Sequence, residues 1–252
     1  MPDLRFSDRV DSYAKYRPGY PAALLNFLTA ECGLSPALAV ADIGAGTGLL
    51  TRLFLDNGNP VWAVEPDPAM RAAAERELGF AFPSFHSVAG SAEATKLPEA
   101  SIDFWTAGQA FHWFDPALAR AEARCILRPG GWAVLVWNVR RTDATPFLTA
   151  YEQFLSNYGK DYLGGHGGDT AAARAVFFGG SVPRQAAFES VQHFDAAGLR
   201  GRFLSSSYAP APAAPECERI LAALNPVFEA HQSGGQVAFE YTTEVYAAQI
   251  TP

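Results

Sequence analysis

Glycines and carboxylates gather in one short stretch of the sequence, and their spacing is typical of a ligand-binding turn. Residues 41–50 read Ala-Asp-Ile-Gly-Ala-Gly-Thr-Gly-Leu-Leu. The stretch follows an apolar run typical of a strand and leads into a segment with helical spacing. Because glycine has no Cβ atom, a ligand can lie against this backbone at the carboxyl end of a strand, where doubly wound sheets bind nucleotides. The turn therefore predicts a nucleotide-like ligand.

A second carboxylate stands at the end of the next predicted strand. The apolar run Val61–Glu65 ends in an acid, about 20 residues beyond the glycine turn. An acid in this position is placed to accept hydrogen bonds from two ribose hydroxyls. Since NAD-binding enzymes share this feature, Glu65 indicates a nucleoside ligand without choosing between cofactors.

The spacing of the glycines distinguishes between the possible nucleoside cofactors. The third glycine of the dinucleotide pattern would fall on Leu49, but this chain has it one residue earlier, at Gly48. With Asp42 two residues before Gly44, the pattern becomes Asp-x-Gly-x-Gly-x-Gly, and in this the sequence resembles the class I S-adenosylmethionine-dependent methyltransferases. A dinucleotide brings a pyrophosphate, whereas S-adenosylmethionine is cationic at sulfur and suits carboxylates and π faces. Asp42 and the aromatics after residue 107 fit the cation better.

The resemblance extends to further loops and implies where the donor binds. Residues 91–93 look like an adenine-binding loop, and the aromatic loop 108–115 stands where donor and acceptor would meet. With Tyr16–Pro21, the chain is similar to methyltransferase type 11 and its trans-aconitate methyltransferase-like subgroup. Motifs and resemblance together imply these cofactor-binding residues: Tyr13, Arg17, Asp42, Gly44, Ala45, Gly46, Gly48, Glu65, Pro66, Met70, Ser91, Ala92, Glu93, Gly108, Gln109, Ala110 and Trp113.

His112 is the candidate catalytic residue. It is either a general base, a group that orients the acceptor, or a structural loop histidine. Methyl transfer from a sulfonium is an in-line substitution, so a base is needed only if the acceptor must lose a proton. Arg140 and Arg141 form either a solvated pair or a clamp for an acceptor carboxylate. The other histidines lack metal-ligand spacing, so no metal is expected.

The elements that must position these residues alternate between short strands and helices from residue 37 to residue 138. The helices expected over 67–79 and 115–127 both open with Asp-Pro, and a third is expected over 49–58. With the resemblance, this alternation predicts an α/β, Rossmann-like doubly wound sheet of seven strands. It would be mostly parallel with an antiparallel closing strand and helices on both faces. The first five expected strands are Leu38–Ile43, Val61–Glu65, Phe85–Ala89, Ile102–Ala107 and Trp132–Trp137, the last entered through a turn at Arg128–Gly131.

We expect residues 1–252 to form a single methyltransferase domain. Its parts are N-terminal cap helices over 1–35, a cofactor-binding core over 36–139, a lid or acceptor insertion over 140–185, and closing strands and helices over 186–252. Within the insertion, a helix around Pro146–Tyr158 precedes a glycine cluster at 164–168, which predicts a mobile lid. Further on, we expect a helix over Glu216–His231 and a closing strand over Val237–Ile250.

Composition limits the partners and the compartment. Nineteen Lys and Arg residues against 26 Asp and Glu residues give a formal net charge of −7, which disfavours nucleic acids and anionic membranes. Cys32, Cys125 and Cys217 are far apart and odd in number, and we expect them to be buried thiols in a reducing compartment. No run approaches the roughly 20 apolar residues that cross a bilayer. We therefore expect a cytoplasmic protein whose partner is a small molecule. The sequence does not predict its oligomeric state.

The predicted function is S-adenosylmethionine-dependent methyl transfer to a small molecule, with S-adenosylhomocysteine as product and O-, N- or C-methylation open. The first alternative is an NAD-binding oxidoreductase. It would keep the sheet and Glu65, but the glycine expected at Leu49 and a Tyr-x-x-x-Lys pair are missing. The second alternative is a non-catalytic module that binds an adenosyl cofactor.

Overall fold

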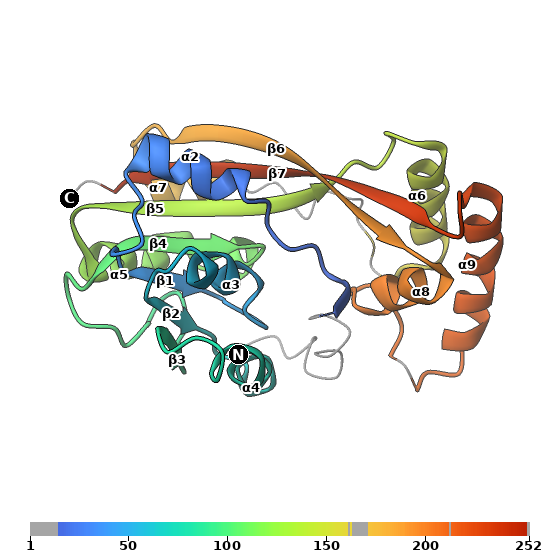
Figure 1. The fold of residues 1–252 in the computed structure, drawn as a ribbon, viewed down its shortest axis with the longest axis horizontal. Coiled ribbons are helices and arrows are strands. Elements are labelled where there is room, and N and C mark those ends of the chain that lie inside the picture. The colour runs from blue at the N-terminus through green and yellow to red at the C-terminus, as the bar shows by residue number, and fades with distance from the viewer. Residues whose placement is uncertain (1–14, 161, 163–170, 212, 251–252) are drawn as a thin grey trace.

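A seven-stranded sheet runs through the molecule, in the order β3-β2-β1-β4-β5-β7-β6 (Figure 1). This computed structural model describes residues 15–160, 162, 171–211 and 213–250. The first five strands are parallel, and β7 is antiparallel to both of its neighbours. The predicted Rossmann-like sheet with an antiparallel closing strand is confirmed. The strands are β1 (Val40–Ile43), β2 (Val61–Val64), β3 (Phe85–Val88), β4 (Ile102–Gly108), β5 (Leu127–Arg140), β6 (Arg184–Phe194) and β7 (Val237–Gln249).

An Asp-Pro pair marks the start of two of the helices that follow strands. The Asp67 carboxylate accepts hydrogen bonds from the amides of Ala69 (2.8 Å) and Met70 (3.3 Å), and Asp115 caps its helix in the same way. Proline follows each cap, where its fixed φ suits the first helical position. The helices are α2 (Ala23–Cys32), α3 (Leu49–Asp56), α4 (Pro68–Leu78), the 3-10 helix η1 (Phe111–Trp113), α5 (Pro116–Ile126), α6 (Pro146–Tyr158), α7 (Ala171–Phe178), α8 (Ala196–Leu204) and α9 (Cys217–His231).

Helices cover both faces of the sheet. Leu28 of α2 and Phe54 of α3 pack on one face against Val136 of β5. On the other face, α5 and α7 enclose the buried ring of Trp105, which lies 4.8 Å from the ring of Phe177 between centroids. Burial on both faces explains why the central strands are almost continuously apolar.

A second hydrophobic cluster lies beyond the carboxyl ends of β4 and β5 (Figure 1). There α6, α8 and α9, which we call the helical cap, pack around Phe239 and Tyr241 of β7. The insertion predicted over 140–185 is thus divided between two places, because α6 joins the cap while α7 packs on the sheet. The glycine cluster at 164–168 lies outside the described residues, so a moving lid stays a prediction.

The structure corrects two expectations. The segment Arg128–Gly131, expected to be a turn before the fifth strand, is a bulge inside β5. Ile102 pairs with Leu127 and Phe104 with Trp132, so all four residues face the single residue Asp103. Cys125 lies on the exposed side of α5 instead of in the core. Within the described part of the chain, no helix has both the length and the apolar character to cross a bilayer.

Candidate functional site

Hydrogen bonds join the glycine turn to the end of β2. The amide of Gly46 donates to Glu65 Oε2 and the amide of Asp67 donates to Glu65 Oε1, both at 2.8 Å. The amides of Gly44 and Ala45 donate to the carbonyl of Val64, at 2.8 and 3.2 Å. The predicted partners from two separate motifs therefore lie in direct contact at the carboxyl edge of the sheet.

Glu65 is a buried carboxylate that its backbone neighbours hold in place. Its side chain is 8% exposed, and this burial raises its pKa while the amides of Asp67 and Gly46 oppose the shift. A carboxylate has about four acceptor positions, of which these two amides occupy two. Glu65 thus keeps capacity to accept further hydrogen bonds from a ligand.

Two glycines of the turn have different surroundings. Gly44 has φ +67°, and a Cβ atom there would lie 2.6 Å from the Cβ of Ala110, so the turn and the loop after β4 approach closely. Gly46 has φ +58°, but an added Cβ would meet no atom within 4 Å. The backbone of Gly46 is therefore open on the side where a side chain would otherwise project.

Asp42 lies beneath the turn. Its side chain is 1% exposed, and its two oxygens accept hydrogen bonds from the hydroxyls of Thr51 (2.6 Å) and Thr106 (3.5 Å). Burial raises the pKa of Asp42 to about 7, although the hydrogen bonds from Thr51 lower it in part. These contacts connect β1 to α3 and β4, so in this structure Asp42 fixes the base of the turn.

The predicted adenine loop is tied to α5. Ser91 and Ala94 form an isolated bridge, and the Thr95 amide donates to the Glu122 carboxylate at 2.8 Å. Glu93 accepts a hydrogen bond from the amide of Asp115 at 3.0 Å. Through Glu93, residues 91–93 lie against the end of the aromatic loop 108–115.

The aromatic loop has one backbone conformation that its residue type disfavours. Gln109 has φ +55°, and its side-chain amide donates to the carbonyl of Asn138 at 2.8 Å. Non-glycine residues with positive φ are uncommon and concentrate at functional sites. Ala110, the next residue, is buried and lies close to Gly44 of the glycine turn. The loop after β4 is therefore held by contacts with both β5 and the glycine turn.

His112 and Trp113 reach solvent on η1, which follows this loop. Their ring centroids are 4.6 Å apart, and Trp113 is 49% exposed. Partial desolvation by the surrounding protein lowers the pKa of His112, so the neutral imidazole dominates at pH 7. A neutral imidazole can accept a proton, which is what a general base requires.

The segment before α2 links the sheet to the helical cap. Asn138 of β5 donates to the carbonyl of Gly19 at 3.0 Å, and the Arg17 guanidinium donates to the carbonyl of Ser205 at 3.0 Å. Tyr20 packs so close to Gly108 that a Cβ there would overlap its hydroxyl group. Arg17 and Gly108 are therefore brought to the same edge, while Tyr13 lies outside the described residues.

Other predicted residues lie at the rim or in the interior. Pro66 is exposed beside Glu65, and Met70 is buried in a small cluster with Ala73. The two arginines at the end of β5 are not a pair: Arg140 is buried, whereas Arg141 lies at the surface against Glu189 and Glu240. Among the described residues, no three His, Cys, Asp or Glu side chains are grouped as they would be to hold a metal.

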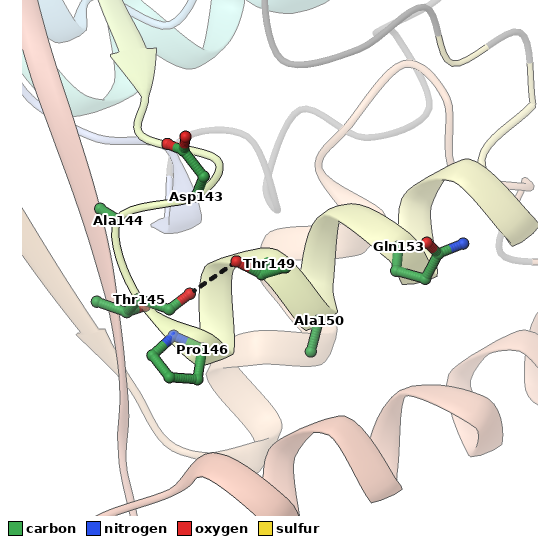
Figure 2. Close-up of a pocket in the computed structure, with 7 residues that line it drawn as sticks. All are labelled: Asp143, Ala144, Thr145, Pro146, Thr149, Ala150 and Gln153. Atoms are coloured by element: carbon green, nitrogen blue, oxygen red, sulfur yellow. Dashed lines mark hydrogen bonds between the residues drawn. The ribbon is translucent and has the colours of Figure 1, made fainter.

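Figure 2 shows an open hollow at the start of α6. The Thr149 hydroxyl donates to the carbonyl of Thr145 at 3.2 Å there. Its lining includes none of the predicted site residues: Asp143, Ala144, Thr145, Pro146, Thr149, Ala150 and Gln153.

Sequence reasoning missed the residues that support the site. Thr51, Thr106 and Asn138 each hold a predicted residue in place by a hydrogen bond. Thr51 lies one turn into the helix that follows the glycines and could have been considered from its spacing. The contacts of Thr106 and Asn138 depend on how strands pair, which no local pattern specifies.

Comparison with known proteins agrees with this geometry. Residues 41–135, which run from the first strand into the fifth, match the family model described as a methyltransferase domain. Residues 41–135 are thus similar to the methyltransferase domain over the whole of that range. The match contains the glycine turn, Glu65, the 91–93 loop and His112, and it ends before the helical cap. No comparison supports the oxidoreductase alternative.

Relatives and solved structures extend the likeness beyond residues 41–135. An uncharacterised methyltransferase of Mycobacterium tuberculosis is 40% identical over 139 residues, 54% of this chain and 53% of that protein. The chain thus spans about half the length of the first curated relatives that it matches. A second uncharacterised methyltransferase, from Schizosaccharomyces pombe, is 26% identical over 98% of this chain and 97% of its own.

Among solved structures, one named as a type II methyltransferase from Anaeromyxobacter dehalogenans has a TM-score of 0.69. It is 24% identical and covers 94% of this chain and 99% of its own. This likeness shows that the two proteins share one fold. The trans-aconitate subgroup stays a prediction.

Proposed function

We propose that this protein transfers a methyl group from S-adenosylmethionine to a small-molecule acceptor. The observation that carries the proposal is the contact between the glycine turn and Glu65 inside the range that matches the methyltransferase domain. When bound, S-adenosylmethionine supplies an electrophilic methyl group on a positively charged sulfur. The residues that would hold it are Gly44, Gly46, Glu65, the 91–93 loop and the 108–110 loop.

The side chains and backbone present fit that ligand. Glu65 retains acceptor positions that suit ribose hydroxyls, and the open side of Gly46 lets a ligand lie against the backbone. Glu65 places a carboxylate at this edge, and a carboxylate favours a cationic ligand over a pyrophosphate. This electrostatic preference distinguishes the sulfonium donor from a dinucleotide.

The residues of the chain chiefly position two reactants. In-line transfer requires the acceptor atom to lie opposite the leaving sulfur, with water kept away. Gln109 and Ala110 are fixed from β5 and from the glycine turn, which makes the 108–110 loop a rigid wall for that arrangement. His112, neutral at pH 7, would take the proton of an acceptor such as a phenol or an amine, and a carboxylate acceptor would need no base.

A small acceptor is proposed because the chain carries a formal net charge of −7. Such a charge opposes polyanions such as RNA.

The first experiment measures S-adenosylhomocysteine binding by calorimetry, with NADH as the competing cofactor. We expect S-adenosylhomocysteine to bind and NADH not to bind. Glu65→Gln should weaken binding about tenfold to a hundredfold, because hydrogen bonds to a charged group contribute about 1.5–3 kcal/mol. Glu77→Gln, an exposed acid on α4, is the matched control and should bind as the native protein does.

Tight NADH binding, or equal affinities in the Glu65→Gln and native proteins, would contradict the proposed donor site. The reaction itself is then tested with labelled S-adenosylmethionine in a metabolite extract, followed by mass spectrometry. A labelled product that disappears without enzyme supports methyl transfer. Donor binding with no labelled product would favour the non-catalytic module.

A further inference from the structure

Two buried arginines lie between the end of β5 and the helical cap. Arg140 of β5 is 6% exposed and Arg202 of α8 is 4% exposed. Phenols from the cap and from β7 surround them, together with one carboxylate. We call this group the arginine–tyrosine cluster: Arg140, Arg202, Tyr151, Tyr162, Tyr208, Tyr241, Ser206 and Glu152.

The charges of the cluster do not balance. Arg140 forms an ion pair with Glu152 and a hydrogen bond of 2.8 Å with the Tyr162 hydroxyl. Arg202 contacts only neutral groups among the described residues. Its Nε donates to the Tyr241 hydroxyl at 3.2 Å and its Nη1 donates to the Ser206 hydroxyl at 3.1 Å. A buried guanidinium without a carboxylate is costly, because its lost hydration is not replaced by an opposite charge.

The cluster also contains polar atoms that bond to nothing within the described chain. Arg140 Nε and the Tyr151 hydroxyl are both buried and make no hydrogen bond there. The Arg140 guanidinium stacks over the Tyr151 ring, 5.0 Å from its centroid, so the two atoms belong to one small region. Most buried polar groups have a partner, so two such donors in one cluster need an explanation.

The phenol of Tyr208 reports the electrostatic potential in the cluster. Burial by itself raises the pKa of Tyr208, but the charges of Arg202, Arg140 and Arg17 outweigh it and lower the pKa. Arginines that reverse the effect of burial on a phenol create a positive potential that favours an anion.

The cluster adjoins the proposed site of methyl transfer. Arg140 lies two residues beyond Asn138, which is about 7 Å along the strand and on the same face. The Asn138 carbonyl accepts the hydrogen bond from Gln109 of the 108–110 loop. Arg17, which contacts Ser205 at the end of α8, comes from the segment that Asn138 also holds. A molecule the size of a metabolite can span this separation.

We propose that the arginine–tyrosine cluster binds an anionic group of the methyl acceptor, a carboxylate or a phosphate. That the anion belongs to the methyl acceptor rests on the proposed function, whereas the binding of an anion by this cluster does not. The oxygens of one oxyanion accept hydrogen bonds from Arg140 Nε, the Tyr151 hydroxyl and the Arg202 guanidinium, and its charge balances Arg202. Arginine suits this role because its planar fork matches both carboxylate and phosphate.

The test uses acetate and inorganic phosphate as probes, because both are small enough to enter any oxyanion site. Thermal unfolding of the full chain is followed as each probe is titrated against chloride at equal ionic strength. We expect at least one probe to raise the melting temperature saturably, and the two arms distinguish a carboxylate site from a phosphate site. Tyr151→Phe removes only the unpartnered hydroxyl, so it should fold normally and weaken the probe at least threefold. Tyr158→Phe, an exposed tyrosine on the same helix, is its control.

A second variant separates a binding role from a structural one. Arg202→Met should weaken the probe at least tenfold, yet melt at or above the native temperature without anion, because it removes an unbalanced buried charge. Arg200→Met, at the surface of the same helix, should change neither quantity. Both arginine variants should bind S-adenosylhomocysteine within twofold of the native protein.

Failure of acetate and phosphate to stabilise the native chain saturably overturns the proposal. Unchanged probe affinity in Tyr151→Phe does so too, whatever the fate of Arg202→Met. If S-adenosylhomocysteine does not bind while an anion does, the proposed function fails and the anion site stands. If S-adenosylhomocysteine binds and no anion does, only the present proposal fails.

Discussion

Replacing Asp42 by Asn tests the electrostatics beneath the glycine turn. The side chain is buried, and burial raises its pKa from 3.8 to about 7. In the folded protein Asp42 therefore holds a proton at pH values where the unfolded chain has lost it. The sign follows: the contribution of Asp42 to stability is greatest below pH 4 and is lost as the pH rises from about 4 to 7, where the folded carboxyl ionises in the interior.

The magnitude comes from the size of this shift. The difference between 3.8 and about 7 is about 3 pKa units, and each unit corresponds to about 1.4 kcal/mol. Ionised Asp42 therefore costs up to about 4 kcal/mol above pH 7 relative to a neutral group of the same shape. About half of this loss of stability occurs between pH 5.5 and pH 7, and the other half between pH 4 and pH 5.5. Asn can exchange hydrogen bonds with Thr51 and Thr106, since hydroxyls both donate and accept.

The assay is urea unfolding of the native protein and Asp42→Asn at pH 5.5 and pH 8.5. We expect the stability of the variant, relative to the native protein, to grow by about 2 kcal/mol between the two pH values. The pH at which this growth ends gives the pKa of Asp42. Asp56→Asn, an exposed acid on α3, controls for the change in net charge. A stability difference that is the same at both pH values would refute the reasoning, because it would place Asp42 outside a desolvated environment.

Two further substitutions separate folding from ligand binding. Gly46→Ala should lower stability by only about 1–2 kcal/mol, the cost of positive φ for a residue with Cβ, yet abolish S-adenosylhomocysteine binding in calorimetry. Gly44→Ala adds a clash with Ala110 and should lose more stability in urea unfolding, so equal losses would contradict the assigned surroundings. Asn138→Ala leaves the buried Thr243 hydroxyl without its acceptor and should cost about 2 kcal/mol. It should also expose the segment before α2 to proteolysis, and a variant cleaved no faster than the native chain would show that Asn138 does not hold that segment.

Local signals in the sequence predicted several elements well, above all in residues 41–135, the donor half of the molecule, where we propose that the methyl donor binds. The Asp-Pro pairs at 67–68 and 115–116 mark helix starts that the structure confirms, because a cap acts on amides only two or three residues away. The helix expected around Pro146–Tyr158 is confirmed as well, and in the structure Thr145 caps it before a proline. The glycine turn and Glu65 could be paired because parallel strands end at one edge.

What the sequence could not predict depends on contacts between distant segments. The placement of β7 between β5 and β6 requires antiparallel pairing with both of them, and no pattern within β7 specifies its neighbours. Arg202 has no signal at all in the sequence. It occupies an ordinary position in a helix, and its burial follows only from packing against Tyr241 and Phe239 of β7.

This division explains where the family likeness ends. The donor half is built from segments within residues 41–135, whose contacts with one another need only the parallel sheet. The helical cap and Arg140 lie after that range, and the segment 15–21 lies before it. Substitutions in the cap can therefore change which acceptor is bound without disturbing Glu65 or the glycine turn. On this argument, a relative that matches only the shared range is expected to share the donor with this protein, while its acceptor must be inferred from its own cap.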